Sequence, residues 1–233
     1  MRSDSKTGRY ILCAITGALA VAVLSLAWPR LRASYRYLPV EIAIERYFQS
    51  HEIPSERLPV LIHFASAAIG RQDHYRYHDG LSTLYLLRAL DFHTPALERR
   101  TAYESAAAEA MESLRRAPAQ PAVWLRLANI RWVLHEEPAA ILFPWKMSIF
   151  TGRTDTTLFS QRIELGLAYR EYMDEEAVAM LRDQLLLAWR IQAGGLMGVL
   201  ARRDRGLTVT RPLIEGTDPL ALAEMEDWLE KLP

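Results

Sequence analysis

The sequence has a single cysteine, Cys13, which lies in an apolar run near the N-terminus. One cysteine excludes an intrachain disulfide and leaves the rest of the chain without a thiol for catalysis or for zinc binding. The sequence also lacks an excess of either charge, with 28 Lys and Arg against 28 Asp and Glu. Nucleic-acid binding normally needs a basic excess, so we expect no nucleic-acid partner.

Strand patterns and catalytic signatures are equally scarce. The only alternating stretch is LTVT at 207–210, which is too short to define a sheet. There is no P-loop, no G-x-S-x-G elbow and no complete H-E-x-x-H motif. The GGLMG segment at 194–198 follows no strand, so it predicts a helix break and not a dinucleotide site. We therefore expect an all-α protein that is not an enzyme and that uses no cofactor or metal.

Residues 10–28, YILCAITGALAVAVLSLAW, form a run without a charged side chain. As a helix this run would extend roughly 28 Å, which matches the hydrocarbon core of a bilayer. Tyr10 and Trp28 bracket it, as amphipathic aromatic residues do at the two membrane interfaces. The sequence predicts a transmembrane signal-anchor at 10–28 that contacts the lipid bilayer, with an N-terminal tail at 1–9 and a juxtamembrane linker at 29–38.

The fate and orientation of this anchor depend on its flanks. Residues 25–27, SLA, also fit a small-x-small cleavage site, although the long apolar run and the arginines after it favour retention. The positive-inside rule does not decide the orientation, because the cations on the two sides are equal in number: Arg2, Lys6 and Arg9 against Arg30, Arg32 and Arg36. The short N-terminal tail favours a cytoplasmic N-terminus. We expect a single-pass protein of the inner (cytoplasmic) membrane with a periplasmic soluble domain.

From residue 39 onward, helix-like segments alternate with short breaks rich in proline, glycine and acidic residues. The helical period of the apolar residues predicts helices at 39–50, 55–69, 81–93, 95–116, 121–135, 138–150, 156–173, 175–192, 194–204 and 219–231. We expect helical repeats over 39–155 and a C-terminal helical extension packed on them over 156–233.

The APAQP segment at 117–121 predicts a tight corner between two helices. Pro118 follows one predicted helix end, and Pro121 suits the first turn of the next helix. Helix 121–135 is apolar around more than half of its circumference, so we expect other helices to cover it on more than one side. A stack of helical hairpins provides this cover.

This corner resembles the junction between consecutive tetratricopeptide repeats, in which a leucine and a proline precede W-x-x-L-A. The residues at the family's spacings are Leu114, Pro118, Trp124, Leu127 and Ala128. Arg131 replaces the family's aromatic residue seven positions after the tryptophan, and we expect Pro144 to interrupt the next helix. The resemblance implies an α-solenoid with a concave binding face, on which the partner-binding residues would be Leu125, Asn129 and Trp132.

A second resemblance covers more of the chain. The P-x-x-W-x-x-L-A motif followed by QRIELGLAYREYM is similar to the membrane-anchored, VpsP-type proteins of bacterial exopolysaccharide clusters. The residues that carry it are Pro121, Trp124, Leu127, Ala128, Glu164, Leu165, Gly166 and Leu167. This resemblance implies a non-enzymatic scaffold or assembly protein whose partner is a polysaccharide polymerase or the export machinery. The alternatives are an assembly factor for a division or secretion complex, and an enzyme that acts on glycans.

The segment RQDHYRYHDG at 71–80 is the strongest candidate for local chemistry. His74 and His78 are four residues apart, a spacing that brings two imidazoles together for zinc only on a helix. Asp73 and Asp79 stand beside the histidines, but the flanking glycines and the crowding of polar residues predict a solvated loop, and no third cysteine or histidine ligand lies nearby. We therefore expect no metal here and assign Tyr75 and Tyr77 as possible partner contacts.

Overall fold

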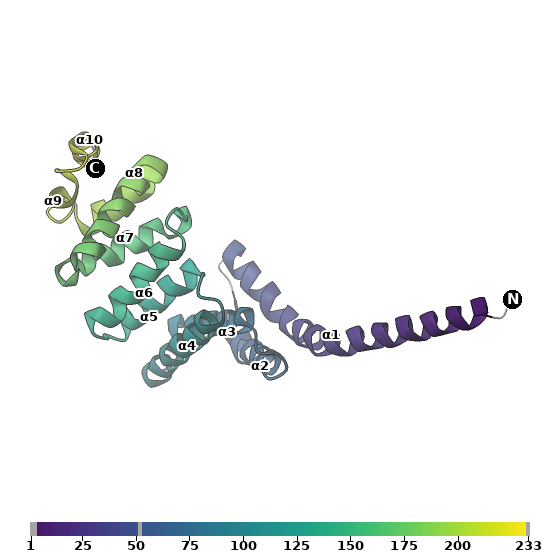
Figure 1. Cartoon of the computed structure of the whole chain (residues 1–233). Helices are drawn as coiled ribbons and strands as arrows, with labels where there is room; N and C mark the ends of the chain where they lie inside the picture. The colour runs from purple at the N-terminus through teal and green to yellow at the C-terminus, as the bar shows by residue number, and fades with distance from the viewer. Residues whose placement is uncertain (1–3, 51–52, 232–233) are drawn as a thin grey trace.

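The structure is a computed structural model that describes residues 4–50 and 53–231. Within these residues the chain is built from helices, and no strand is present. Figure 1 shows a long N-terminal helix that projects from a body of stacked shorter helices. The prediction of an all-α protein is confirmed.

Helix α1, Asp4–Ser50, is 47 residues long. Among the described residues it is the one helix that is long and apolar enough to cross a membrane, and none of its most apolar window is buried in the body. The segment predicted as a juxtamembrane linker at 29–38 is helical, because α1 continues through Pro29 and Pro39. A proline inside a helix removes a backbone hydrogen bond and bends the axis, and Figure 1 shows α1 bent and not ended.

Packing explains why α1 continues beyond its apolar section. Helices α2, Leu58–Ile69, and α3, Tyr75–Leu90, cover one of its faces. The buried residues of that face recur at helical spacing: Ala33, Tyr37, Val40 and Ala43. Apolar burial contributes about 25 cal/mol per Å², which offsets the hydrogen bonds that the prolines remove.

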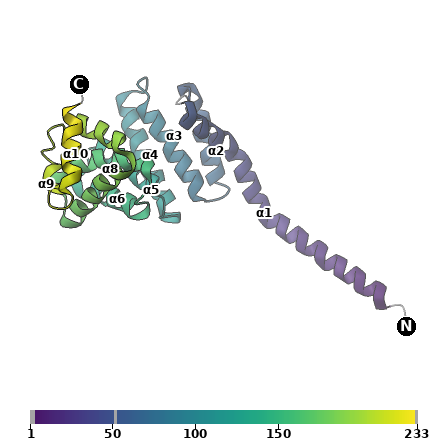
Figure 2. The same cartoon turned by 90° about the horizontal axis from the view of Figure 1, so that it is seen from above.

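The remaining helices pack mostly against their neighbours in sequence, and Figure 2 shows this succession from above. Their bounds are η1 Ser55–Arg57, α4 Ala96–Arg116, α5 Pro121–Val133, α6 Pro138–Thr151, η2 Thr156–Leu158, α7 Phe159–Ala168, η3 Arg170–Tyr172, α8 Glu175–Arg203, α9 Arg211–Ile214 and α10 Pro219–Glu230. The buried apolar side chains of the described residues form clusters within α1–α3, within α4–α5 and within α5–α10. Each helix is therefore stabilised mainly by the helices before and after it.

The proline corner lies between α4 and α5, where it was predicted. The indole Nε1 of Trp124 donates a hydrogen bond of 2.7 Å to the carbonyl oxygen of Pro118. The same ring packs edge-on against Phe143 of α6, with 5.8 Å between the ring centroids. Leu127 and Ala128 are buried behind it. Trp124 thus holds the corner and also contacts the following helix.

Two other expected breaks have different outcomes. Pro144 lies inside α6 without ending it, and its burial in the core offsets the lost hydrogen bond. The break expected near residue 193 is a kink inside α8, where Gln192 has φ −144° and ψ 52°. Gly194 and Gly195 follow it after Ala193, and glycine is a weak helix former.

Candidate functional site

The second half of α1 is joined to α3 through Tyr37. The Tyr37 hydroxyl donates a hydrogen bond of 3.0 Å to the carbonyl oxygen of Arg76, and its ring centroid lies 4.7 Å from that of Tyr77. Gly80 permits this approach, because a Cβ atom there would lie 1.7 Å from the Tyr37 hydroxyl oxygen. The hydroxyls of Ser34 and Tyr77 are 3.2 Å apart and share a hydrogen bond. We call these contacts between Tyr37 and Ser34 of α1 and residues of α3 the joint. They fix the second half of α1 against the rest of the helical body.

A groove of about 410 Å³ lies between the C-terminal part of α1 and the helices α3 and α5. Most of its lining is apolar: Tyr47, Phe48, Leu86, Leu87, Leu90, Tyr103, Ala122, Ile130, Val133 and Leu158. Its polar groups are Thr83, Arg126, Asn129 and Gln161. A mainly apolar cavity of this size with a few polar groups is typical of sites that bind a ligand or a short peptide segment.

The groove continues into a polar section of about 470 Å³ along α1. Arg126 of α5 donates hydrogen bonds to the carboxylate of Asp79 at 2.7 Å and to its carbonyl oxygen at 3.1 Å. Glu41 and Glu45 of α1 line the same section. Arg126 therefore holds the carboxylate of Asp79 on the α3 side of this section, opposite the two acids of α1.

The three partner-binding residues that the tetratricopeptide resemblance implied lie in different environments in the structure. Asn129 lines the groove, and its Nδ2 donates a hydrogen bond of 3.4 Å to Oε1 of Gln161. Trp132 is half-buried and packs against the large core of α5–α10. Leu125 is 1% exposed inside that core, so its side chain is not presented to a partner. The helices packed on α5 cover its apolar circumference and bury this position.

The predicted loop at 71–80 is wrong from Tyr75 onward, where α3 begins. His74 caps this helix, since its Nδ1 accepts a hydrogen bond of 3.3 Å from the backbone N–H of Arg76. Tyr75 is half-buried and lines the polar section of the groove, whereas Tyr77 and His78 are buried. The polar residues of this segment mostly contact other helices, which is why their crowding gave the wrong prediction.

His78 links α3 to α4 through two carboxylates. Its Nε2 is 2.9 Å from Oδ1 of Asp73, and its Nδ1 is 2.6 Å from Oε2 of Glu109. Burial alone lowers the pKa of His78, but the hydrogen bonds to Glu109 and Asp73 outweigh burial and raise it. Arg116 pairs with Asp73 and, together with His78, lowers the pKa of that carboxyl to about 2. With a carboxylate at each ring nitrogen, the doubly protonated imidazolium is favoured.

The two histidines of this segment do not converge on a common point. His74 caps α3 and stacks near Tyr75, with 4.6 Å between the ring centroids, whereas both nitrogens of His78 face carboxylates. Across residues 4–50 and 53–231, no three His, Cys, Asp or Glu side chains are arranged to hold one metal ion. The segment is therefore best described as an interhelix network.

Several groove residues were not predicted from the sequence. Thr83, Leu86, Leu87 and Leu90 recur at helical spacing on α3, and all four lie within the helix predicted at 81–93, so this pattern was available in the sequence. Phe48 of α1 is different. Its contribution depends on the return of α1 to α3, a long-range contact that no local pattern reveals.

No family model matches the chain, and no match was found among curated proteins or solved structures. The fold and the groove define a class of protein: an all-α body joined to one helix able to cross a membrane, with an open groove beside that helix. The function must therefore be inferred from these features.

Proposed function

We propose that the chain is a single-pass membrane protein whose body is a tetratricopeptide-like α-solenoid and acts as a non-enzymatic scaffold. One observation carries the proposal: α1 runs without a break from its exposed apolar section into the wall of the groove. A partner bound in the groove is then held close to the bilayer. Confinement of this kind raises the effective concentration of the partner, so that modest contacts suffice for binding.

The arrangement of the helices supports a repeat architecture. The groove is lined chiefly by α3, α5 and the start of the α7 segment, which alternate with α4 and α6 along the chain. In stacked helical hairpins the first helices of successive hairpins line the concave face. The strongest packing is between α3 and α4, between α5 and α6, and between α7 and α8. These pairs correspond to successive hairpins.

The lining of the groove indicates the kind of partner. Leu90 and Val133 are 52% and 44% exposed, so the groove offers apolar surface to an incoming segment. Its Arg126 and Asn129 side chains already have partners within the protein. We propose that the groove binds an apolar peptide segment of a membrane complex, in the manner of a helix in a hydrophobic groove. The resemblance to the exopolysaccharide family favours a polysaccharide polymerase or an export protein at the periplasmic side of the inner membrane.

Site-specific photo-crosslinking tests the groove. A photoreactive amino acid at Leu90 or Val133 should give the same discrete adduct in the membrane fraction, and mass spectrometry should identify a polysaccharide polymerase or export protein. Phe150 is the matched control, because it is an exposed apolar residue, 76% exposed, that does not line the groove. Equal adducts from Phe150, or a lone monomer in several mild detergents, would refute the scaffold. A division or secretion protein in the adduct would instead show that the scaffold serves that complex and not the polysaccharide machinery.

A reporter enzyme tests the orientation separately. Alkaline phosphatase fused after Pro233 is active only outside the cytoplasm, and we expect it to be active. An inactive phosphatase together with an active cytoplasmic reporter at the same position would place the body inside the cell. That outcome would overturn the periplasmic location and leave the groove test unaffected.

A further inference from the structure

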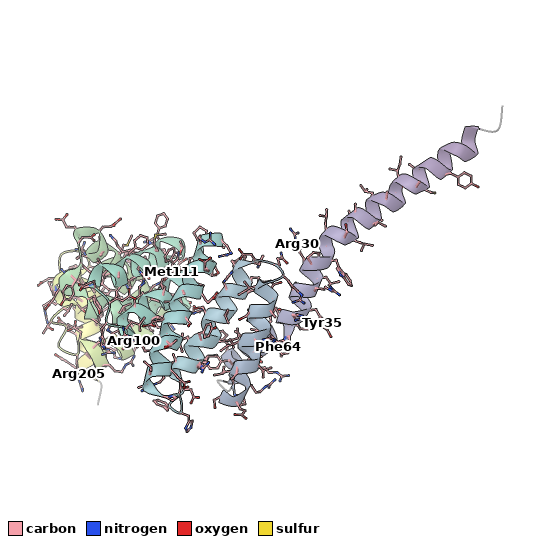
Figure 3. The ribbon with its side chains drawn as sticks, turned by 90° about the horizontal axis from the view of Figure 1, so that it is seen from below. Arg30, Tyr35, Phe64, Arg100, Met111 and Arg205 are labelled. Carbon is pink, nitrogen blue, oxygen red and sulfur yellow. The ribbon has the colours of Figure 1, made fainter. Side chains whose placement is uncertain are left out.

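Five arginines gather where α1 leaves the body, and we call them the arginine collar: Arg30, Arg32, Arg36, Arg71 and Arg76. The first three lie on α1, the fourth lies between α2 and α3, and the last lies in the first turn of α3. Figure 3 labels Arg30 and Tyr35 at this place, where α1 turns away from the stacked helices. The three collar arginines on α1 directly follow the apolar run at 10–28.

The collar frames two pockets against α1. One has a volume of about 430 Å³, and its lining includes Arg30, His74 and Arg76, the hydroxyls of Ser34 and Tyr77, and a single acid, Glu41. The other has a volume of about 490 Å³, and Arg32, Arg36 and Arg71 share it with Trp28, Leu31 and Tyr35. The first pocket therefore offers hydrogen-bond donors to an anion, and the second adds an apolar wall beside its cations.

The charges of the collar are not neutralised within the described protein. None of the five arginines has a carboxylate at ion-pair distance, whereas Arg116, Arg126 and most other basic side chains of the body are paired. Asp73 lies between the collar arginines in sequence, but it is engaged by His78 and Arg116. Burial, followed by the positive charges of Arg76 and Arg30, lowers the pKa of His74. The positive charges of Arg30 and Arg76 thus act on His74, which lines the same pocket.

The position of the collar indicates the ligand. If α1 crosses the membrane, as we propose above, Trp28 lies at the interface and the collar lies level with the lipid headgroups. Guanidinium groups bind phosphate through paired hydrogen bonds, and anionic headgroups attract basic side chains near the surface. A soluble phosphate would use the cations alone. A phospholipid would also use the apolar wall formed by Trp28, Leu31 and Tyr35.

We propose that the arginine collar binds the headgroups of anionic phospholipids and thereby holds the groove-bearing body against the surface of the bilayer. The proposal rests on the membrane-spanning role of α1. It adds a contact with the lipid headgroups to the contact that the apolar run makes with the hydrocarbon core.

The test uses the full-length protein in nanodiscs made from equal amounts of phosphatidylglycerol and phosphatidylcholine. The protein is extracted in mild detergent, and the lipids that it retains are quantified by mass spectrometry. The wild-type protein should be enriched in phosphatidylglycerol. Arg30→Gln and Arg76→Gln should each lower the enrichment by up to about fivefold, the factor expected for one basic side chain near an anionic surface. Arg202→Gln is the matched control, because Arg202 is exposed and lies at the end of α8, away from the collar.

Other outcomes would overturn the proposal. An enrichment that is absent in the wild type, or that falls equally in Arg202→Gln, would show that the collar is not a lipid site. Loss of the enrichment in inorganic phosphate, but not in chloride of equal ionic strength, would make the collar a site for soluble phosphate. Extraction of the wild-type protein from membranes by alkaline carbonate is read separately. Release of the protein from the membrane would refute the proposal that α1 spans the bilayer. Retention of the protein without enrichment in phosphatidylglycerol would refute only the proposal that the collar binds lipid.

Discussion

The joint between α1 and α3 gives the sharpest prediction, because a single added methyl group should disturb it. In Gly80→Ala the new Cβ would lie 1.7 Å from the hydroxyl oxygen of Tyr37 and 2.8 Å from its Cζ atom. Both distances are below van der Waals contact, so the Tyr37 ring must move. Gly80 lies within a regular helix, and alanine adopts that backbone conformation easily. The predicted effect therefore comes from the contact with α1 and not from the backbone.

The size of the effect follows from the contacts that Tyr37 loses. Its hydrogen bond to the carbonyl oxygen of Arg76 contributes about 1 kcal/mol, and its ring contact with Tyr77 contributes about 1 kcal/mol. Partial exposure of the buried ring adds about 1–2 kcal/mol. The better helix propensity of alanine returns up to about 1 kcal/mol. We expect a net loss of about 2–4 kcal/mol, which lowers the Tm of a chain of this size by about 4–16 °C.

The assay is thermal unfolding of the full-length protein in a mild detergent, followed by circular dichroism. Gly194→Ala is the matched control, since no atom lies within 4 Å of the position of its new Cβ, and it should leave the Tm unchanged or raise it. A double-mutant cycle with Tyr37→Phe tests the contact itself, because it removes the nearest clashing atom. The double variant should lose less stability than the sum of the single variants. If the losses of stability in the two single variants add exactly in the double variant, or if Gly80→Ala is as stable as the control, then the predicted contact between Gly80 and Tyr37 is refuted.

Three further predictions concern the body. Arg162 is fully buried and donates hydrogen bonds to the carbonyl oxygens of residues 148 and 152, so Arg162→Ala should cost about 3–5 kcal/mol in urea unfolding. Trp124→Phe removes the hydrogen bond to Pro118 and should cost about 1 kcal/mol in the same assay, with no change in helix content. The pKa of His78 is raised by folding, so its stabilising contribution is fully present below the unfolded value of 6.5 and is lost as the pH rises through the higher folded value. His78→Gln should abolish this loss of stability above pH 6.5, and an unchanged pH profile would contradict the imidazolium bridge.

The helices were predictable because their signals are local. The corner between α4 and α5 depends on prolines and a tryptophan within a few residues of one another, and the structure has it where the sequence placed it. The errors occur where distant contacts decide the outcome. The segment at 29–38 reads as a linker until α2 and α3 bury one face of it, and the segment at 71–80 reads as a loop until α4 supplies partners for its charges. The groove was predicted only at Asn129 and, in its polar section, at Tyr75, because one of its walls is formed by α1.

The same joint connects the two proposed binding regions. Tyr37, Glu41 and Arg76 line both the collar pocket and the polar section of the groove. A headgroup phosphate that draws Arg76 toward the bilayer changes the charge beside Glu41, and this change alters the affinity of the groove for its partner. Thermodynamic linkage then requires that the bound partner changes the affinity for the lipid by the same factor. We therefore expect the yield of photo-crosslinking from Val133 to differ between membranes with and without phosphatidylglycerol. Arg76→Gln should remove this difference between the two membranes, whatever its effect on the absolute yield. Equal yields in both membranes for the wild-type protein would show that the lipid and partner contacts act independently, even though they share these side chains.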